Sequence, residues 1–96
     1  MPGYDVTEWA RMKTISSAKR HALLARANTE GWKQLTPYHF QKWVIDEDGY
    51  DACINWYPST HKWVGPGGHV CRNPKAFGTY IYLQLYPDGA KPYAER

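Results

Sequence analysis

The chain has 96 residues, 43% of them hydrophobic, and a formal net charge of +3. This length predicts a single domain over residues 1–96, and this hydrophobic share argues against a wholly disordered chain. The mildly basic charge counts against a mimic of DNA, which needs a strongly acidic surface, and permits contact with nucleic acid or an acidic protein.

The first third of the chain is predicted to be helical, over about residues 5–28. The sequence DVTE at residues 5–8 has the pattern of a capping box, with an acceptor at the N-cap and a carboxylate three residues later. Alanine and long straight side chains dominate from there to Ala27, without Pro or Gly. Two short helices separated near Ser16 and Ser17 are the alternative to one continuous helix.

From Trp32 to Tyr86 the pattern favours strands. The segments PYHFQKWVI (37–45) and YDACINWY (50–57) flank Asp48-Gly49, a sequence favoured in two-residue hairpin turns. This turn places Trp43 opposite Ile54, which gives the hairpin two faces. One face carries Trp43, Ile45, Ala52, Ile54 and Trp56, and the other carries Phe40, Lys42, Val44, Cys53, Asn55 and Tyr57. We expect the first face to form the core.

A second turn is predicted at PSTH, residues 58–61, with Tyr57 opposite Lys62 and Trp56 opposite Trp63. Residues 65–75 are rich in Gly and Pro and are predicted to form a loop. Residues 77–86 (FGTYIYLQLY) are predicted to form a fourth strand, and residues 88–96 are predicted to form a flexible tail. The predicted fold class is α+β: an N-terminal helix, or two short helices, packed on an antiparallel sheet of three to four strands within residues 32–86.

Aromatic and basic side chains on the outward face are the first candidate for a binding surface, because such residues are common in interface hot spots. The predicted contact residues are Phe40, Lys42, Tyr57, His61, Lys62, Tyr80 and Tyr82. The alternative is that these rings are core, since small sheets use aromatic residues on both faces. The cations of the predicted N-terminal helix scatter around its circumference, which is typical of a solvated helix surface.

Enzymatic and metal-binding patterns are weak. Cys53, His61, His69 and Cys71 are the ligand types of a zinc site, but their spacing lacks the C-x-x-C and H-x-x-x-H signatures. The carboxylates at residues 46–51 flank a hairpin tip, where turn chemistry alone explains them. There is no G-x-S-x-G or phosphate-binding Gly loop, so we expect no enzyme, cofactor or metal.

The run from Ile54 to Trp63 resembles a pattern common in small bacteriophage-encoded proteins. It consists of a hydrophobic strand, an aromatic residue, Pro, Ser or Thr, Thr, a turn residue, Lys and Trp. The turn residue is usually Gly, whereas this chain has His61, so the turn geometry can differ. The resemblance covers the central hairpin, from about Phe40 to Val64. It implies a short accessory protein that acts against host defence or host machinery by binding and blocking.

The sequence therefore predicts a non-enzymatic inhibitor of a host factor, such as an anti-CRISPR or other anti-defence protein. Its partner would be a host protein or ribonucleoprotein complex in the bacterial cytoplasm, with no contact to membrane. The alternative is a single-stranded nucleic-acid-binding protein that uses the same aromatic and basic face, with Tyr38 among its outward rings. An exposed edge at residues 77–86 would allow two copies to pair as a homodimer.

Overall fold

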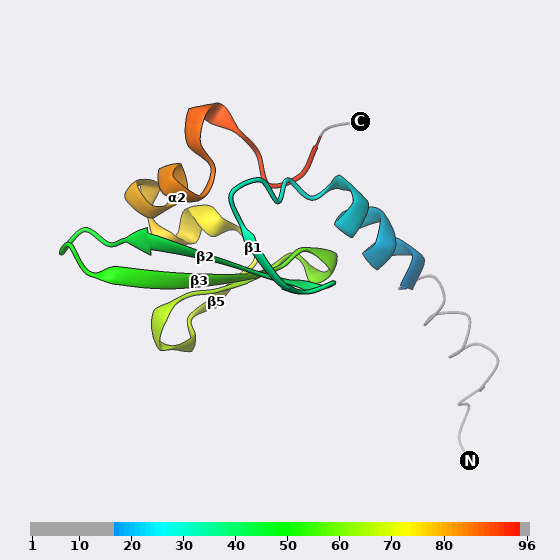
Figure 1. Cartoon of the computed structure of the whole chain (residues 1–96), viewed down its shortest axis with the longest axis horizontal. Helices are drawn as coiled ribbons and strands as arrows, with labels where there is room; N and C mark the ends of the chain where they lie inside the picture. The colour runs from blue at the N-terminus through cyan, green and yellow to red at the C-terminus, as the bar shows by residue number, and fades with distance from the viewer. Residues whose placement is uncertain (1–16, 95–96) are drawn as a thin grey trace, which may run out of the picture.

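The computed structural model describes residues 17–94. A helix over residues 17–26 precedes an antiparallel sheet of five strands in the order β1-β2-β3-β4-β5, and short helices follow the sheet (Figure 1). The strands are β1 Lys33–Thr36, β2 His39–Ile45, β3 Asp51–Tyr57, β4 Lys62–Val64 and β5 Val70–Cys71. The helical segments are η1 Pro58–Thr60, η2 Pro66–Gly68, η3 Pro74–Phe77, α2 Thr79–Leu85 and η4 Pro87–Gly89. The α+β class is confirmed, and the sheet has five strands where three to four were predicted.

The helix that covers the sheet is α2, near the C-terminal end, rather than the predicted N-terminal helix (Figure 1). Of the helix predicted over residues 5–28, residues 17–26 are helical. Leu24 of this helix and Ala27, directly after it, pack against the core. The capping sequence at residues 5–8 and Ser16 lie outside the described residues. No helix within residues 17–94 is long and apolar enough to cross a membrane.

Residues 77–86 form the end of η3 and helix α2, so the prediction of a fourth strand there was wrong. Asn73 is the N-cap of η3, and its side chain accepts a hydrogen bond from the Lys75 amide at 3.1 Å. The helical period brings Ile81 and Leu85 to the face that packs against the core. The alternation of apolar residues in this segment predicts a strand, but packing against the sheet stabilises a helix instead.

Gln84 connects α2 to the end of β2 through two hydrogen bonds. Its side-chain amide accepts from the Ile45 backbone amide at 2.8 Å and donates to the Ile45 carbonyl at 2.7 Å. These two bonds satisfy the backbone polar groups of the last β2 residue. Together with Leu85, they fix which face of the sheet the helix covers.

The hairpin between β2 and β3 has a three-residue loop, not the predicted two-residue turn. The Asp46 amide donates to the Tyr50 carbonyl at 2.8 Å, and the Gly49 amide donates to the Asp46 carbonyl at 3.0 Å. Within the loop, positive φ is confined to Gly49, at +88°. This combination is a type I turn followed by a left-handed residue, the common three-residue hairpin loop.

The longer loop shifts the register by one residue, so Trp43 pairs with Cys53, and Phe40 pairs with Trp56. Because side chains alternate along a strand, this shift turns every β2 side chain to the opposite face. Phe40 and Val44 are buried, and Trp43 and Ile45 are exposed. The predicted faces are therefore correct for β3 and wrong for β2.

Asp46 stabilises this loop, and its replacement provides a first test of the turn. Its carboxylate accepts from the backbone amides of Asp48 and Tyr50, each at 2.9 Å. We expect Asp46→Ala to lower the free energy of unfolding by about 1–2 kcal/mol, because two exposed amides lose a charged acceptor. Urea unfolding followed by circular dichroism measures the loss. Glu47→Ala in the same loop is the control, and an equal loss in both variants would contradict this role for Asp46.

The hairpin between β3 and β4 is as predicted, with Trp56 opposite Trp63 and Tyr57 opposite Lys62. The turn consists of η1 followed by His61 in the left-handed conformation, at φ 51° and ψ 44°. This is the position at which the phage pattern usually has glycine. His61 adopts the backbone conformation that glycine favours there, so the turn does not need another geometry.

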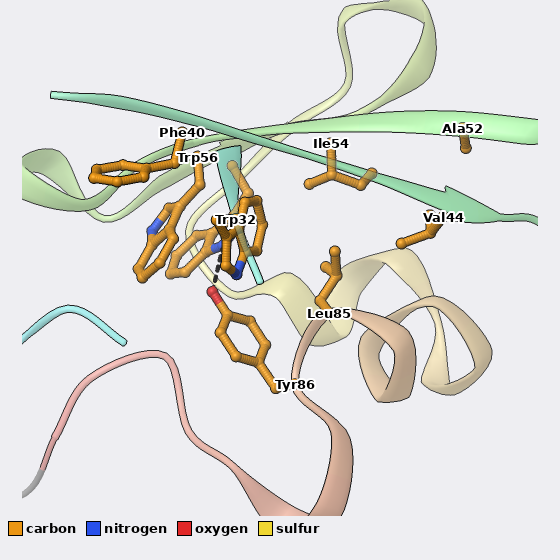
Figure 2. Close-up of a cluster of buried hydrophobic side chains, with 9 residues drawn as sticks. Trp32, Phe40, Val44, Ala52, Ile54, Trp56, Leu85 and Tyr86 are labelled. Atoms are coloured by element: carbon orange, nitrogen blue, oxygen red, sulfur yellow. Dashed lines mark hydrogen bonds between the residues drawn. The ribbon is translucent and has the colours of Figure 1, made fainter. Parts of the chain in front are cut away.

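The core is an aromatic cluster on the sheet face covered by α2 (Figure 2). Trp56 lies at its centre with 0% of its surface exposed. Its ring is 5.1 Å from that of Trp32 and 5.5 Å from that of Trp63. Trp63 Nε1 donates to Tyr86 Oη at 3.3 Å. The indole N–H groups of Trp32 and Trp56 have no acceptor among the described residues, so packing holds these two rings in place.

Residues 90–94, in the segment predicted as a flexible tail, lie against this core. Tyr93 pairs with Ala27 in an isolated bridge, and its hydroxyl donates to the Pro58 carbonyl. The Ala94 amide donates to the Arg26 carbonyl at 2.8 Å. Burial raises the pKa of Tyr93 to about 12, which keeps its hydroxyl protonated as a donor at neutral pH.

Candidate functional site: the outer face of the sheet

The sheet face opposite α2, called the outer face here, is partly open to solvent. Trp43 of β2 is its most exposed large side chain, at 63%, and Ile45 and Val70 on the same face are also exposed. The outer face is formed by His39, Gln41, Trp43, Ile45, Cys53, Asn55, Tyr57, Lys62, Val64 and Val70. Neither α2 nor the helix over residues 17–26 shields Trp43 from solvent.

Apolar side chains extend across the strands of this face. Trp43 lies directly opposite Cys53, and Val64 lies directly opposite Val70. Side chains in such cross-strand pairs are about 4.5–5.5 Å apart at Cβ, close enough for each pair to form one apolar patch. Asn55 of β3, which is opposite Val64, lies between the two patches. Exposed tryptophan on a rigid strand provides a large contact area with little loss of side-chain freedom on binding, which suits a protein interface.

A polar row borders the apolar part, formed by His39, Tyr57 and Lys62 on three successive strands. The His39 ring stacks on the Tyr57 ring at 4.5 Å, and Lys62 Nζ lies 4.7 Å from the Tyr57 ring centre. His39 Nε2 also lies 2.8 Å from Asn55 Oδ1. His39 and Lys62 come from the two strands that flank β3, and both lie against the Tyr57 ring.

Two of the seven predicted contact residues lie on the wrong side of the sheet. Phe40 is 6% exposed and belongs to the core. Lys42 also points to the inner side, where Nζ donates to the Leu85 carbonyl at 3.1 Å and lies 5.9 Å from the Trp32 ring. Burial lowers the pKa of Lys42. Both placements follow from the register shift in the β2–β3 hairpin.

Tyr57 and Lys62 lie together on the outer face as predicted. His61, next in the turn, packs at the edge of the core, with its ring 4.4 Å from that of Tyr93. Burial lowers the pKa of His61, and the charges of Arg72, Arg26 and Lys19 lower it further. His61 is therefore a neutral, half-buried ring at pH 7 rather than a charged contact residue.

Tyr80 and Tyr82 belong to α2 and so cannot join Tyr57 on the outer face. Tyr80 is exposed, whereas Tyr82 packs against the core with its ring 5.6 Å from that of Tyr86. Lys75 Nζ lies 5.5 Å from the Tyr82 ring centre. The seven predicted residues are thus divided among the core, the outer face, the β3–β4 turn and the helix.

The four candidate zinc ligands, Cys53, His61, His69 and Cys71, do not lie together in the structure. Cys53 lies on the outer face, whereas Cys71 packs against the core opposite Trp63. His69 lies beside Phe77, at 6.0 Å between ring centres. Across residues 17–94, no three His, Cys, Asp or Glu side chains are placed to share a metal ion.

Both cysteines are free thiols rather than activated nucleophiles. Burial raises the pKa of Cys53 and that of Cys71. The nucleophile in cysteine catalysis is the thiolate, which requires a lowered pKa. These environments therefore disfavour attack by either sulfur at neutral pH.

Sequence reasoning missed Trp43 as an exposed residue. It expected Tyr38 to face outward and interpreted Arg20 as part of a solvated helix surface, but it did not place either beside Lys62. The sequence held a signal for Trp43, because a DEDG loop also fits the three-residue hairpin with Gly at the left-handed position. Tyr38 lies in the tight β1–β2 connection and Arg20 on the helix over residues 17–26. Their proximity to Lys62 across a shared pocket is a tertiary feature with no local signal.

Comparison with protein-family models, with curated proteins and with solved structures finds no match to this chain.

Proposed function

We propose that this protein is a non-enzymatic, phage-type inhibitor that binds a host protein or ribonucleoprotein complex, most plausibly a defence complex, through its outer face. The observation that supports this proposal best is the exposure of Trp43 on β2, where 63% of its surface is open to solvent. A solvent-exposed tryptophan beside further apolar side chains is typical of a binding surface rather than of an inert one.

The charge around this surface favours a partner with an acidic surface. Lys62 borders the apolar part of the outer face on β4, and the chain carries a net charge of +3. Complementary charge speeds encounter and restricts the choice of partner. A ribonucleoprotein of the bacterial cytoplasm combines apolar protein surface with exposed phosphates, which matches both parts of the outer face.

The experiment is co-purification of the tagged protein with partners from bacterial extract, with and without nuclease treatment. We expect a defined partner to be retained by the wild type, and Trp43→Ala to weaken its binding about 30-fold, as for a hot-spot residue worth about 2 kcal/mol. Tyr50→Ala is the matched control, because Tyr50 is an exposed aromatic residue at the hairpin tip.

Two results would count against the proposal. One is the absence of any retained partner under either condition. The other is a retained partner whose affinity for the Trp43→Ala protein equals its affinity for the wild type, because binding would then use another surface.

A further inference from the structure

Two adjoining grooves flank the β3–β4 turn and together form what we call the turn groove. The first has a volume of about 480 Å³, and the second about 380 Å³. Arg20, Ser59 and Thr60 line both. The helix over residues 17–26 forms one wall and the turn forms the other, so the groove is built from segments far apart in the sequence.

Positive charge dominates the turn groove. Arg20 and Lys62 line the first part, and Lys19 and Arg72 join Arg20 in the second. Among residues 17–94, no aspartate or glutamate lines either part. Cations gathered around a groove without carboxylates raise the local concentration of anions. Burial is the main cause of the lowered pKa of His61, and the positive charges of Arg72, Arg26 and Lys19 lower it further.

The hydroxyl groups and backbone of the turn add hydrogen-bonding capacity at defined positions. Ser17 and Ser59 bring hydroxyl groups to the first part of the groove. Arg72 Nη1 donates to the Thr60 carbonyl at 3.2 Å, which anchors this guanidinium against the turn. Arginine and hydroxyl side chains are among the groups that contact phosphate oxygens in nucleic-acid complexes.

An aromatic ring is available at the edge of the first part. Tyr38 lines it and is 51% exposed, and its backbone amide is held by Thr36 Oγ1 at 3.2 Å. Tyr57 also lines this part, but His39 and Lys62 already cover its ring. A planar ligand would therefore stack on Tyr38 rather than on Tyr57.

The geometry points to a binding site for single-stranded nucleic acid in the turn groove, where Arg20 and Lys62 contact backbone phosphates and Tyr38 stacks on one base. A single strand is favoured over a duplex because stacking on Tyr38 requires an unstacked base. This site lies beside the outer face and shares only Tyr57 and Lys62 with it. Arg20 and Tyr38 line the groove and lie outside the outer face, so replacing them tests this site separately from the protein interface proposed above.

The test is fluorescence anisotropy of the purified protein with a labelled oligothymidylate of about 12 nucleotides, within the range of about 4–16 that single-strand-binding domains cover. We expect affinity to fall with increasing salt. Arg20→Ala should weaken binding about tenfold and reduce the slope of log K against log salt by about 0.7, the value for one lost phosphate contact. Tyr38→Ala should weaken binding about tenfold without changing the slope.

Two control variants distinguish a defined nucleic-acid site from unspecific attraction between the oligonucleotide and a positively charged protein. Lys33→Ala removes the same charge from an exposed position on β1 outside both linings, and it should leave the affinity within about twofold. Arg20 is exposed, so its replacement should preserve the circular dichroism spectrum. Trp43→Ala should bind the oligonucleotide like the wild type, which distinguishes this site from the proposed protein interface.

Three outcomes would overturn the assignment. The first is no binding at low salt. The second is an equal loss of affinity in Lys33→Ala and Arg20→Ala, which would indicate unspecific attraction by net charge. The third is competition by polyglutamate at the same charge concentration as the oligonucleotide, which would identify an acidic protein surface as the ligand.

Discussion

Trp56→Ala is expected to lower the free energy of unfolding by about 3–5 kcal/mol, the usual range for removing a fully buried large aromatic side chain. Trp56 is 0% exposed and its ring is surrounded by those of Trp32, Trp63, Tyr86 and Tyr93. The truncation removes all these ring contacts at once. Small domains have total stabilities of about 5–15 kcal/mol, so the variant should be marginally folded at 25 °C.

Trp43→Ala is the matched control, since it removes the same side chain from the neighbouring strand. Trp43 is 63% exposed, so we expect a loss of less than about 1 kcal/mol, mostly from its cross-strand contact with Cys53. Urea unfolding of both variants gives the comparison. If Trp43→Ala proved as destabilising as Trp56→Ala, both tryptophans would have to be buried.

Leu85→Ala is expected to cost about 2–4 kcal/mol, whereas Leu83→Ala should cost less than about 0.5 kcal/mol. On helix α2, Leu85 is 1% exposed and Leu83 is 54% exposed, because residues two apart on a helix are rotated by about 200° and point to nearly opposite faces. Leu85 packs into the core cluster between α2 and the sheet. Thermal unfolding of the two variants measures both effects.

This pair also distinguishes the helix from the strand predicted for residues 77–86. On a strand, Leu83 and Leu85 lie on the same face, and truncating either would have a similar effect. A ratio of effects near one would therefore contradict the helix. Tyr80, which is exposed on the same helix, supplies a second control as Tyr80→Ala.

The parts of the fold that could be predicted from sequence were those fixed by strong local signals. The PSTH turn determined the β3–β4 register, and Trp56 and Trp63 pair as expected. The alternation along β3 correctly sent Ile54 inward and Tyr57 outward. The helical pattern was also correct over residues 17–26, whereas residues 27–28 of the predicted helix are not helical.

The β2 face was wrong because two loop types compete for the same residues. Asp48-Gly49 fits a two-residue turn, but the Asp46 carboxylate can hold the amides of Asp48 and Tyr50 in a three-residue loop. A change of one residue in loop length decides whether Phe40 or Trp43 faces the core. Local propensity could not decide between these loops, because the choice also depends on how β2 packs against α2.

The candidate sites were only partly predictable for the same reason. Tyr57 and Lys62 are neighbours because of a predicted turn, and they were identified together. Helix α2 was missed because FGTYIYLQLY is rich in residues that favour strands, and Gln84 and Leu85 act only when the sheet is present. Arg20 and Tyr38 meet Lys62 only through the tertiary fold.

The pairing of β2 with β3 is the claim on which the outer face depends, and nuclear Overhauser effects between the two strands test it most directly. Directly opposed residues of antiparallel strands have Cα atoms about 4.5–5.5 Å apart, within range of backbone proton contacts. The structure predicts backbone contacts between Phe40 and Trp56 and between Val44 and Ala52. Contacts that instead place Trp43 opposite Ile54 would bury Trp43 and remove the proposed binding surface.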